Sequence, residues 1–137
     1  MSKDVILNKV ENIKNCIERI ESKKPFSPQE LKANFDLQDI ISVNLQRAIQ
    51  SSVDLANHIC SENNLGVPKD MAGVFEILVT KNILSEKLGN ELIKSVGLRN
   101  VLVHEYDGID WGIVFIVTEN RLQTFRDFCG AIVQLIS

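Results

Sequence analysis

Three side chains suited to acid–base and phosphate chemistry lie close together in the stretch GLRNVLVHEYDG. They are Arg99, His104 and Tyr106, and apolar residues separate them. Arginine carries a permanently charged planar fork that suits phosphate oxygens, and histidine gives or takes a proton near neutral pH. These two groups are sufficient for metal-free phosphodiester cleavage, with His104 as general base or acid and Arg99 stabilising the charge on phosphorus. Tyr106 adds a hydrogen-bond donor or a ring that stacks on a base.

The spacing of these residues does not bring all three together on one straight helix. At about 100° of rotation per residue, Arg99 and Tyr106 share a face, whereas His104 is turned roughly 140° from Arg99. The reach of the arginine side chain, unwinding near residues 107–108 or a second copy of the chain could close this gap. A shared site is the most natural of the three, because a twofold axis would set two motifs against each other. The spacing by itself also fits surface or interface ion pairs and no catalysis.

A second polar stripe lies upstream and repeats at intervals of three and four residues. It comprises Asn44, Arg47, Ser51, Asp54 and His58. The stripe borders the apolar face of its predicted helix. It therefore fits either a solvated flank, with a hydrogen bond between Asp54 and His58, or the wall of a groove. In the second interpretation Arg47 or Asp54 lies beside Arg99 and His104 as a supporting residue of that site.

Apolar residues that recur every three or four positions predict an all-α fold that positions these groups. The expected helices cover about residues 3–22, 28–63, 69–82, 86–105 and 110–136, with a candidate interruption at residues 34–36. Ser27 and Ser85 are the expected N-caps, and Pro28 the first helical residue after Ser27. Gly108 is expected to end the fourth helix by accepting a left-handed backbone. The result is an up-and-down bundle of four to five helices in one domain over residues 1–137.

The segment IVFIVT at residues 113–118 has two interpretations. Its β-branched residues also fit a strand. Helical spacing resumes directly afterwards, and a single strand without a partner would leave backbone groups unpaired. We therefore expect helix throughout residues 110–136.

Composition narrows the class of protein. The chain has 137 residues, 45% of them hydrophobic, and a formal net charge of −3, which is typical of a globular domain and not of a nucleic-acid coat. Any contact with RNA must therefore be local. No signal peptide or membrane span is visible, so we expect a cytoplasmic protein without membrane contact. Cys16, Cys60 and Cys129 are widely spaced and odd in number, which favours reduced core residues over disulfides or a metal site.

The segment RNVLVHEY at residues 99–106 matches the R-x4-6-H-x-Y pattern of the HEPN superfamily, including the polar Asn100 after the arginine. NLQRAIQSSVDLANHI and GLRNVLVHEYDGID also resemble its HepT-type toxins. The resemblance implies an all-α homodimer whose paired motifs face a cleft and cleave cellular RNA as a metal-independent endoribonuclease, without a cofactor. It assigns catalysis to Arg99 and His104, and supporting roles to Asn100 and Tyr106.

The resemblance also implies a protein partner. Toxins of that family are neutralised by a cognate minimal nucleotidyltransferase antitoxin that can transfer AMP from ATP to the motif tyrosine, here Tyr106. The added phosphate would pair with Arg99, and the nucleoside would fill the groove. Two alternatives remain open: a noncatalytic helical partner or substrate subunit of a nucleotidyltransferase, and a purely structural bundle.

Overall fold

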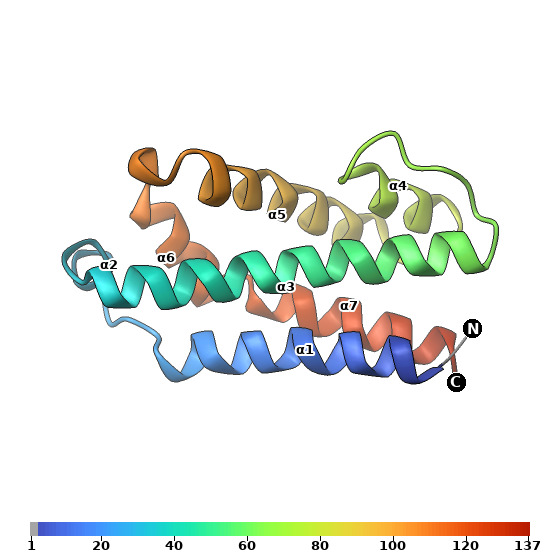
Figure 1. Ribbon diagram of the computed structural model, residues 1–137, viewed down its shortest axis with the longest axis horizontal. Helices are drawn as coiled ribbons and strands as arrows, with labels where there is room; N and C mark the ends of the chain where they lie inside the picture. The colour runs from blue at the N-terminus through green and yellow to red at the C-terminus, as the bar shows by residue number, and fades with distance from the viewer. Residues whose placement is uncertain (1–2) are drawn as a thin grey trace.

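The computed structural model describes residues 3–137, whose regular secondary structure is entirely helical. Four longer helices form an up-and-down bundle: α1 (Lys3–Ser22), α3 (Phe35–Glu62), α5 (Glu86–His104) and α7 (Leu122–Leu135). Shorter elements connect them: α2 (Pro28–Ala33), α4 (Gly73–Thr80), the 3₁₀ turn η1 (Tyr106–Gly108) and α6 (Trp111–Asn120). Figure 1 shows α3 between α5 and α1, with the end of α5 above the start of α3. The predicted all-α bundle is confirmed.

The apolar stripes of the longer helices form the core. Those of α1 and α3 make the most extensive contact between any two of the described helices. The buried aliphatic residues of α1 recur at the spacing of one helix face: Ile6, Val10, Ile13, Ile17 and Ile20. Each fully buried aliphatic side chain stabilises the fold by about 1.5–3 kcal/mol relative to exposure. This contact makes α3 a rigid support for the groups that lie on its outer face.

Two predicted helices are each divided in the structure. The one expected over residues 28–63 breaks at Asn34, whose backbone is extended and whose Oδ1 accepts a hydrogen bond from the Leu37 N–H at 3.0 Å. The one expected over residues 110–136 breaks at Arg121, where φ is −121° and ψ is 0°. The first break falls within the candidate interruption at residues 34–36. The second was not expected, because apolar spacing continues through a one-residue break.

The predicted N-caps are confirmed. Ser27 Oγ accepts from the Glu30 N–H at 3.2 Å, and Ser85 Oγ accepts from the Leu88 N–H at 3.1 Å. The helix expected from residue 69 begins only at Gly73, because the Asp70 side chain accepts the Gly73 N–H at 2.8 Å and holds the preceding residues in a turn. The IVFIVT segment is helical, within α6, as expected.

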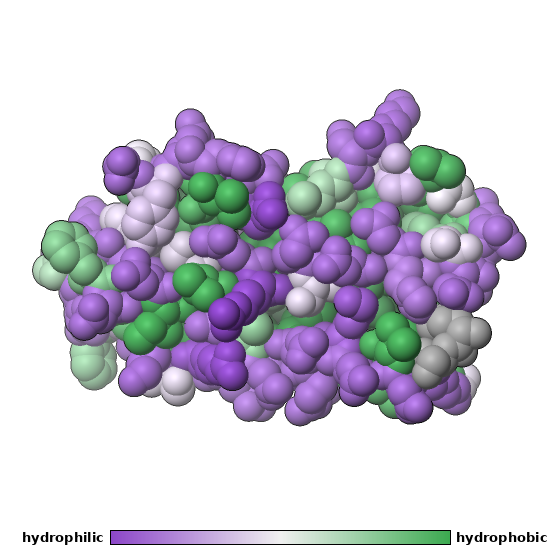
Figure 2. Space-filling view, viewed as in Figure 1, coloured by the Kyte–Doolittle hydropathy of each residue, from purple (hydrophilic) through white to green (hydrophobic). Residues whose placement is uncertain are grey.

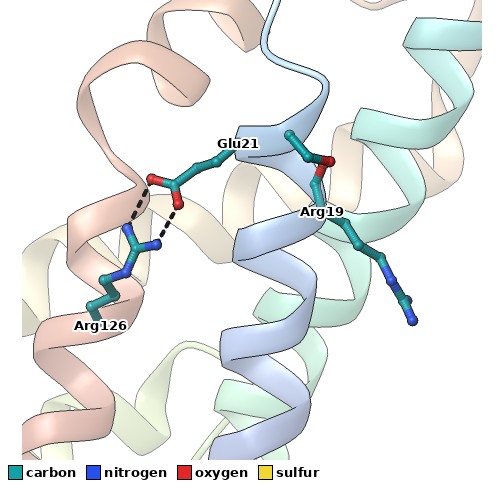
Figure 3. A network of polar contacts seen from close by, with 4 residues as sticks. Arg19, Glu21 and Arg126 are labelled. Atoms are coloured by element: carbon teal, nitrogen blue, oxygen red, sulfur yellow. Dashed lines mark hydrogen bonds and ion pairs between the residues drawn. The ribbon is translucent and has the colours of Figure 1, made fainter.

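A charged pair joins the first and last helices of the bundle. Arg126 of α7 donates to both carboxylate oxygens of Glu21 in α1, with Nη1 to Oε2 at 3.0 Å and Nη2 to Oε1 as the shorter bond. Figure 3 shows the two planar groups facing each other, while Arg19 points away from them. The pair is partly exposed, so it adds little free energy to the contact between α7 and α1.

The three cysteines are buried and free, as predicted. Burial raises the pKa of the Cys129 thiol to about 11, so this group stays protonated in the core. Within residues 3–137, none of the helices combines the length and the apolar character that crossing a bilayer requires.

Candidate active site

The sequence motif lies where α5 ends. The helix is regular through His104, and Glu105 then leaves helical geometry at φ −131° and ψ 41°. The expected end at residue 105 is close, but the expected reason is wrong. Gly108 does not adopt a left-handed backbone, and of the glycines in residues 3–137 only Gly66 has positive φ. The chain instead turns through η1, in which the Gly108 N–H donates to the Glu105 carbonyl at 2.9 Å.

The end of α5 redirects Tyr106 toward α3. Because Tyr106 lies in η1, it does not share the face of Arg99 that a continuous helix would give it. Its phenol donates a hydrogen bond to Asp39 Oδ1 at 2.5 Å. Its ring meets Trp111 edge to face, with centroids 5.9 Å apart and an interplanar angle of 80°. Contacts from two other helices therefore fix this side chain.

The environment of Tyr106 strongly favours its neutral form. Burial, the hydrogen bond to Asp39 and the charge of Asp39 together raise the pKa of Tyr106 from 10.0 to about 12. Each cause acts in the same direction, because a phenolate would be poorly solvated and would face a carboxylate. At neutral pH the side chain is therefore a hydrogen-bond donor.

Arg99 and His104 lie in the last turns of α5. The Arg99 side chain is half-buried, and its Nη1 donates to Asn100 Oδ1 at 3.4 Å, whereas His104 is exposed. Since α5 is regular through both residues, the offset of roughly 140° between them persists. One chain thus presents an arginine and a histidine at one helix end, on separate faces.

The structure differs from the expected arrangement of the polar stripe on α3 in one hydrogen bond. Asp54 Oδ1 accepts from Gln50 Nε2 at 2.9 Å. The expected bond between Asp54 and His58 is wrong, because Gln50, one turn earlier, occupies the carboxylate. His58 Nε2 is buried without a hydrogen-bond partner.

Arg47 lies on the flank of α3 that faces α1. Burial raises the pKa of Cys16 in α1, and the charges of Arg19 and Arg47 partly offset that rise, which places Arg47 near this thiol. Within residues 3–137, no hydrogen bond or ion pair joins Arg47 or Asp54 to the motif on α5. Tertiary packing groups the motif with Asp39 instead.

Asp39, the hydrogen-bond partner of Tyr106, is not among the residues that the sequence predicts for the site. It precedes the polar stripe and lies 67 residues before Tyr106, on the first turns of α3. Nothing in the helical periodicity distinguishes it from other exposed acidic residues. The only sequence signal was its place at the start of a long helix.

A cavity of about 490 Å³ lies along α5 beside the motif. Its wall includes Leu98, the residue next to Arg99, and residues of α6 and α7. Three cationic side chains line it, namely Lys87, Lys94 and Arg121, together with Glu91, which accepts a hydrogen bond from Thr124 Oγ1 at 2.7 Å. These cations are suited to phosphate groups that pass along α5.

An all-α bundle that presents an arginine, a histidine and a tyrosine at the end of one helix has the groups that phosphodiester cleavage requires. A family model described as "Ribonuclease HepT-like" matches residues 13–132. The chain therefore belongs to the HepT-like ribonuclease family, and the predicted resemblance is confirmed.

Individual relatives agree over nearly the whole chain. The "mRNA nuclease HepT" of Shewanella oneidensis is 38% identical over 129 residues, which cover 94% of this chain and 96% of that protein. A chain of a toxin–antitoxin complex solved with AMP-PNP has a TM-score of 0.91 at 36% identity, covering 96% of this chain and 99% of that one. A tri-AMPylated Shewanella oneidensis HEPN toxin in complex with an MNT antitoxin has a TM-score of 0.90 at 36% identity, covering 97% and 99%.

Proposed function

We propose that this protein is the toxin of a toxin–antitoxin pair and cleaves cellular RNA in the cytoplasm as a metal-independent endoribonuclease. Arg99 and His104 are its catalytic residues. The proposal rests on one observation. An arginine, an exposed histidine and a tyrosine that is hydrogen-bonded to α3 all lie at the end of α5. The family match and the name of the Shewanella relative, an mRNA nuclease, support the same reaction.

The cleavage chemistry follows from the two catalytic groups. The imidazole of His104 accepts the proton of a ribose 2′-hydroxyl, or donates one to the leaving 5′-oxygen, as the 2′-oxygen attacks the adjacent phosphorus. The guanidinium of Arg99 stabilises the negative charge that grows on the phosphoryl oxygens. Asn100 supports the reaction by accepting a hydrogen bond from Arg99, which limits the orientations of the guanidinium. Neither step requires a metal ion or a cofactor.

A homodimer completes the site. Within one chain Arg99 and His104 face directions roughly 140° apart, so we place the scissile phosphate between Arg99 of one copy and His104 of the other. Large apolar side chains are exposed close to the motif in sequence: Val103, Ile113 and Ile116 are 40%, 54% and 53% accessible. A second copy that covers these residues would bury apolar surface and bring the two motifs together.

The supporting RNA contacts extend along α3. Arg47 is exposed and lies two turns beyond Asp39, about 12 Å along the axis at 1.5 Å per residue. Asp54 supports the same face by holding Gln50. The face that carries α3 is mainly hydrophilic, with scattered apolar groups (Figure 2).

A cognate minimal nucleotidyltransferase antitoxin silences the toxin by transferring AMP to Tyr106. Solved relatives include an AMPylated HEPN toxin with its MNT antitoxin, and Tyr106 is the only tyrosine of this chain. The attached phosphate competes for Arg99, and the nucleoside occupies the groove that RNA must enter. The partially exposed ring leaves room for the second enzyme to approach.

The test compares purified wild type with Arg99→Ala and His104→Ala on RNA in EDTA. Each substitution should lower the cleavage rate by about 10²-fold or more, because each removes a group that acts in the transition state. Arg19→Ala, which removes an arginine of α1, is the matched control and should cleave normally. Undiminished cleavage by both motif variants would refute the proposal.

Growth assays separate catalysis from a noncatalytic role. Expression of the wild type should arrest growth, and co-expression of the antitoxin should relieve the arrest. Expression of His104→Ala should not arrest growth. Cells that express Tyr106→Phe should stay arrested when the antitoxin is co-expressed. If the protein were only a substrate subunit of the nucleotidyltransferase, His104→Ala would behave as the wild type does.

A further inference from the structure

We propose that Asp39 is a catalytic residue of the silencing reaction, the group that accepts the phenolic proton when AMP is transferred to Tyr106. This inference rests on the proposed function, in which Tyr106 is the AMP acceptor. The phenol of Tyr106 already donates to Asp39 Oδ1 at 2.5 Å. The carboxylate is exposed on α3, so that water can remove a proton from it.

The chemistry of the transfer requires a proton acceptor at this position. A neutral phenol is a weak nucleophile, and the raised pKa of about 12 leaves almost no phenolate near neutral pH. The proton must therefore leave while the new bond forms. The carboxylate that faces the hydroxyl is placed to take it without rearrangement of either helix.

The transfer exchanges one oxygen substituent on the α-phosphorus for another. A lone pair of Tyr106 Oη attacks the α-phosphorus of ATP, and the bond from this phosphorus to the pyrophosphate oxygen breaks. The pyrophosphate leaves with that electron pair, and the phenolic proton passes to Asp39 Oδ1. Asp39 then releases the proton to water. The antitoxin supplies ATP and orients it, while the toxin supplies both nucleophile and base.

Among residues 3–137, no other group near the phenol receives its hydrogen bond. Among residues 3–137, Asp39 is the only charged group whose field shifts the pKa of Tyr106. Trp111, which packs against the ring from α6, carries no charge. On the segment of Tyr106 itself, His104, Glu105 and Asp107 are the nearest titratable residues, and none of them receives the phenolic hydrogen bond. His104 is a rival acceptor, and it is tested separately.

Asp39→Asn separates proton acceptance from positioning. The amide oxygen of Asn still accepts the hydrogen bond from Tyr106, but it does not take up a proton near neutral pH. Asp39→Ala removes both abilities. Asp36→Asn removes the same charge one turn earlier on the outer face of α3 and is the matched control. Circular dichroism confirms that each variant is folded.

The experiment follows the first addition of AMP by the cognate nucleotidyltransferase, with magnesium and ATP, using intact-protein mass and peptide mapping over a pH series. Asp39→Asn should slow the transfer about a hundredfold near neutral pH, the size of a typical general-base effect. The ratio of wild-type to variant rates should shrink as pH rises, because hydroxide then removes the phenolic proton. Rate ratios cancel the pH dependence of the antitoxin itself. Asp36→Asn should match the wild type.

Each outcome decides one question. An Asp39→Asn protein modified as fast as the wild type at every pH would overturn the role of Asp39. Equal losses in Asp39→Asn and Asp39→Ala at a ratio independent of pH would also overturn it, since they indicate a structural effect. A large loss in His104→Ala alone would assign the proton to His104. Wild type that stays unmodified, or Tyr106→Phe that is modified, would instead refute the proposed AMP acceptor.

Discussion

Arg99 and His104 stand on the same helix, five residues apart, yet their side chains face directions about 140° from each other. Within one copy, the guanidinium bonds to its neighbour Asn100, and the imidazole extends into solvent. We therefore propose that a phosphate held by both groups lies between two copies.

Mixing two inactive variants tests this shared site. Arg99→Ala retains His104, and His104→Ala retains Arg99, so a mixed dimer contains one complete site and one site lacking both groups. After subunit exchange at equal concentrations, about a quarter of the wild-type activity should return, since half the dimers are mixed and half their sites are intact. Activity is measured on RNA in EDTA, and light scattering at micromolar concentration should give a dimer. A fully active monomer would contradict the geometry.

The titration of Tyr106 is directly observable, because no other tyrosine contributes to the tyrosinate absorbance. The wild type should titrate near pH 12, since burial, the Asp39 hydrogen bond and the Asp39 charge all raise the pKa. Asp39→Asn should titrate at lower pH because it removes the charge, while burial still holds the pKa above 10.0. A midpoint unchanged by this substitution would show that the hydrogen bond does not persist in solution.

The raised pKa of Tyr106 also predicts how the stability of the fold depends on pH. The folded state holds the phenolic proton of Tyr106 more tightly than the unfolded chain does. Tyr106 therefore stabilises the fold fully below pH 10, and this stabilisation is lost as the pH rises toward 12. Tyr106→Phe should therefore lose less stability than the wild type over this range. Urea unfolding at several pH values measures the difference, and comparison of the two proteins cancels the titration of lysines.

Two helical glycines should respond in opposite ways to alanine. At Gly89 of α5 an added Cβ would overlap Cγ2 of Val79, whose β-branched side chain turns with difficulty. Gly89→Ala should therefore destabilise the fold by about 1–3 kcal/mol. At Gly130 of α7 an added Cβ meets nothing within 4 Å, so Gly130→Ala should stabilise it by about 0.5–1 kcal/mol. Denaturant unfolding measures both, and changes of the same sign would contradict the packing described for Gly89.

The Glu21–Arg126 pair should contribute little to stability. Its side chains are 42% and 34% exposed, so Arg126→Ala should cost less than about 1 kcal/mol and leave RNA cleavage unchanged. The hydrogen bond from Arg126 lowers the pKa of Glu21. The pair therefore stabilises the fold above pH 4.5, the ordinary pKa, and this stabilisation is lost as the pH falls through the lowered pKa. Thermal melts from neutral to acidic pH should therefore converge for the two proteins. A constant difference in acid would instead indicate lost packing.

The sequence predicted the helical fold well because helix formation and amphipathic packing are encoded locally. The stripe from Ile6 to Ile20 and the caps at Ser27 and Ser85 each depend on residues within a few positions of one another. The breaks at Asn34 and Arg121 were harder to place. Each interrupts the backbone for one residue while the apolar spacing continues on both sides.

The sequence by itself determined the motif and the elements that carry it, since Arg99, His104 and Tyr106 follow a recognisable pattern on a predicted helix. Tertiary structure decided the partners of those residues. The position at which α5 ends sets the direction of Tyr106. The packing of α5 over α3 brings this side chain to Asp39, 67 positions away. A helical period specifies which residues share a face, but only the relative placement of helices specifies what that face meets.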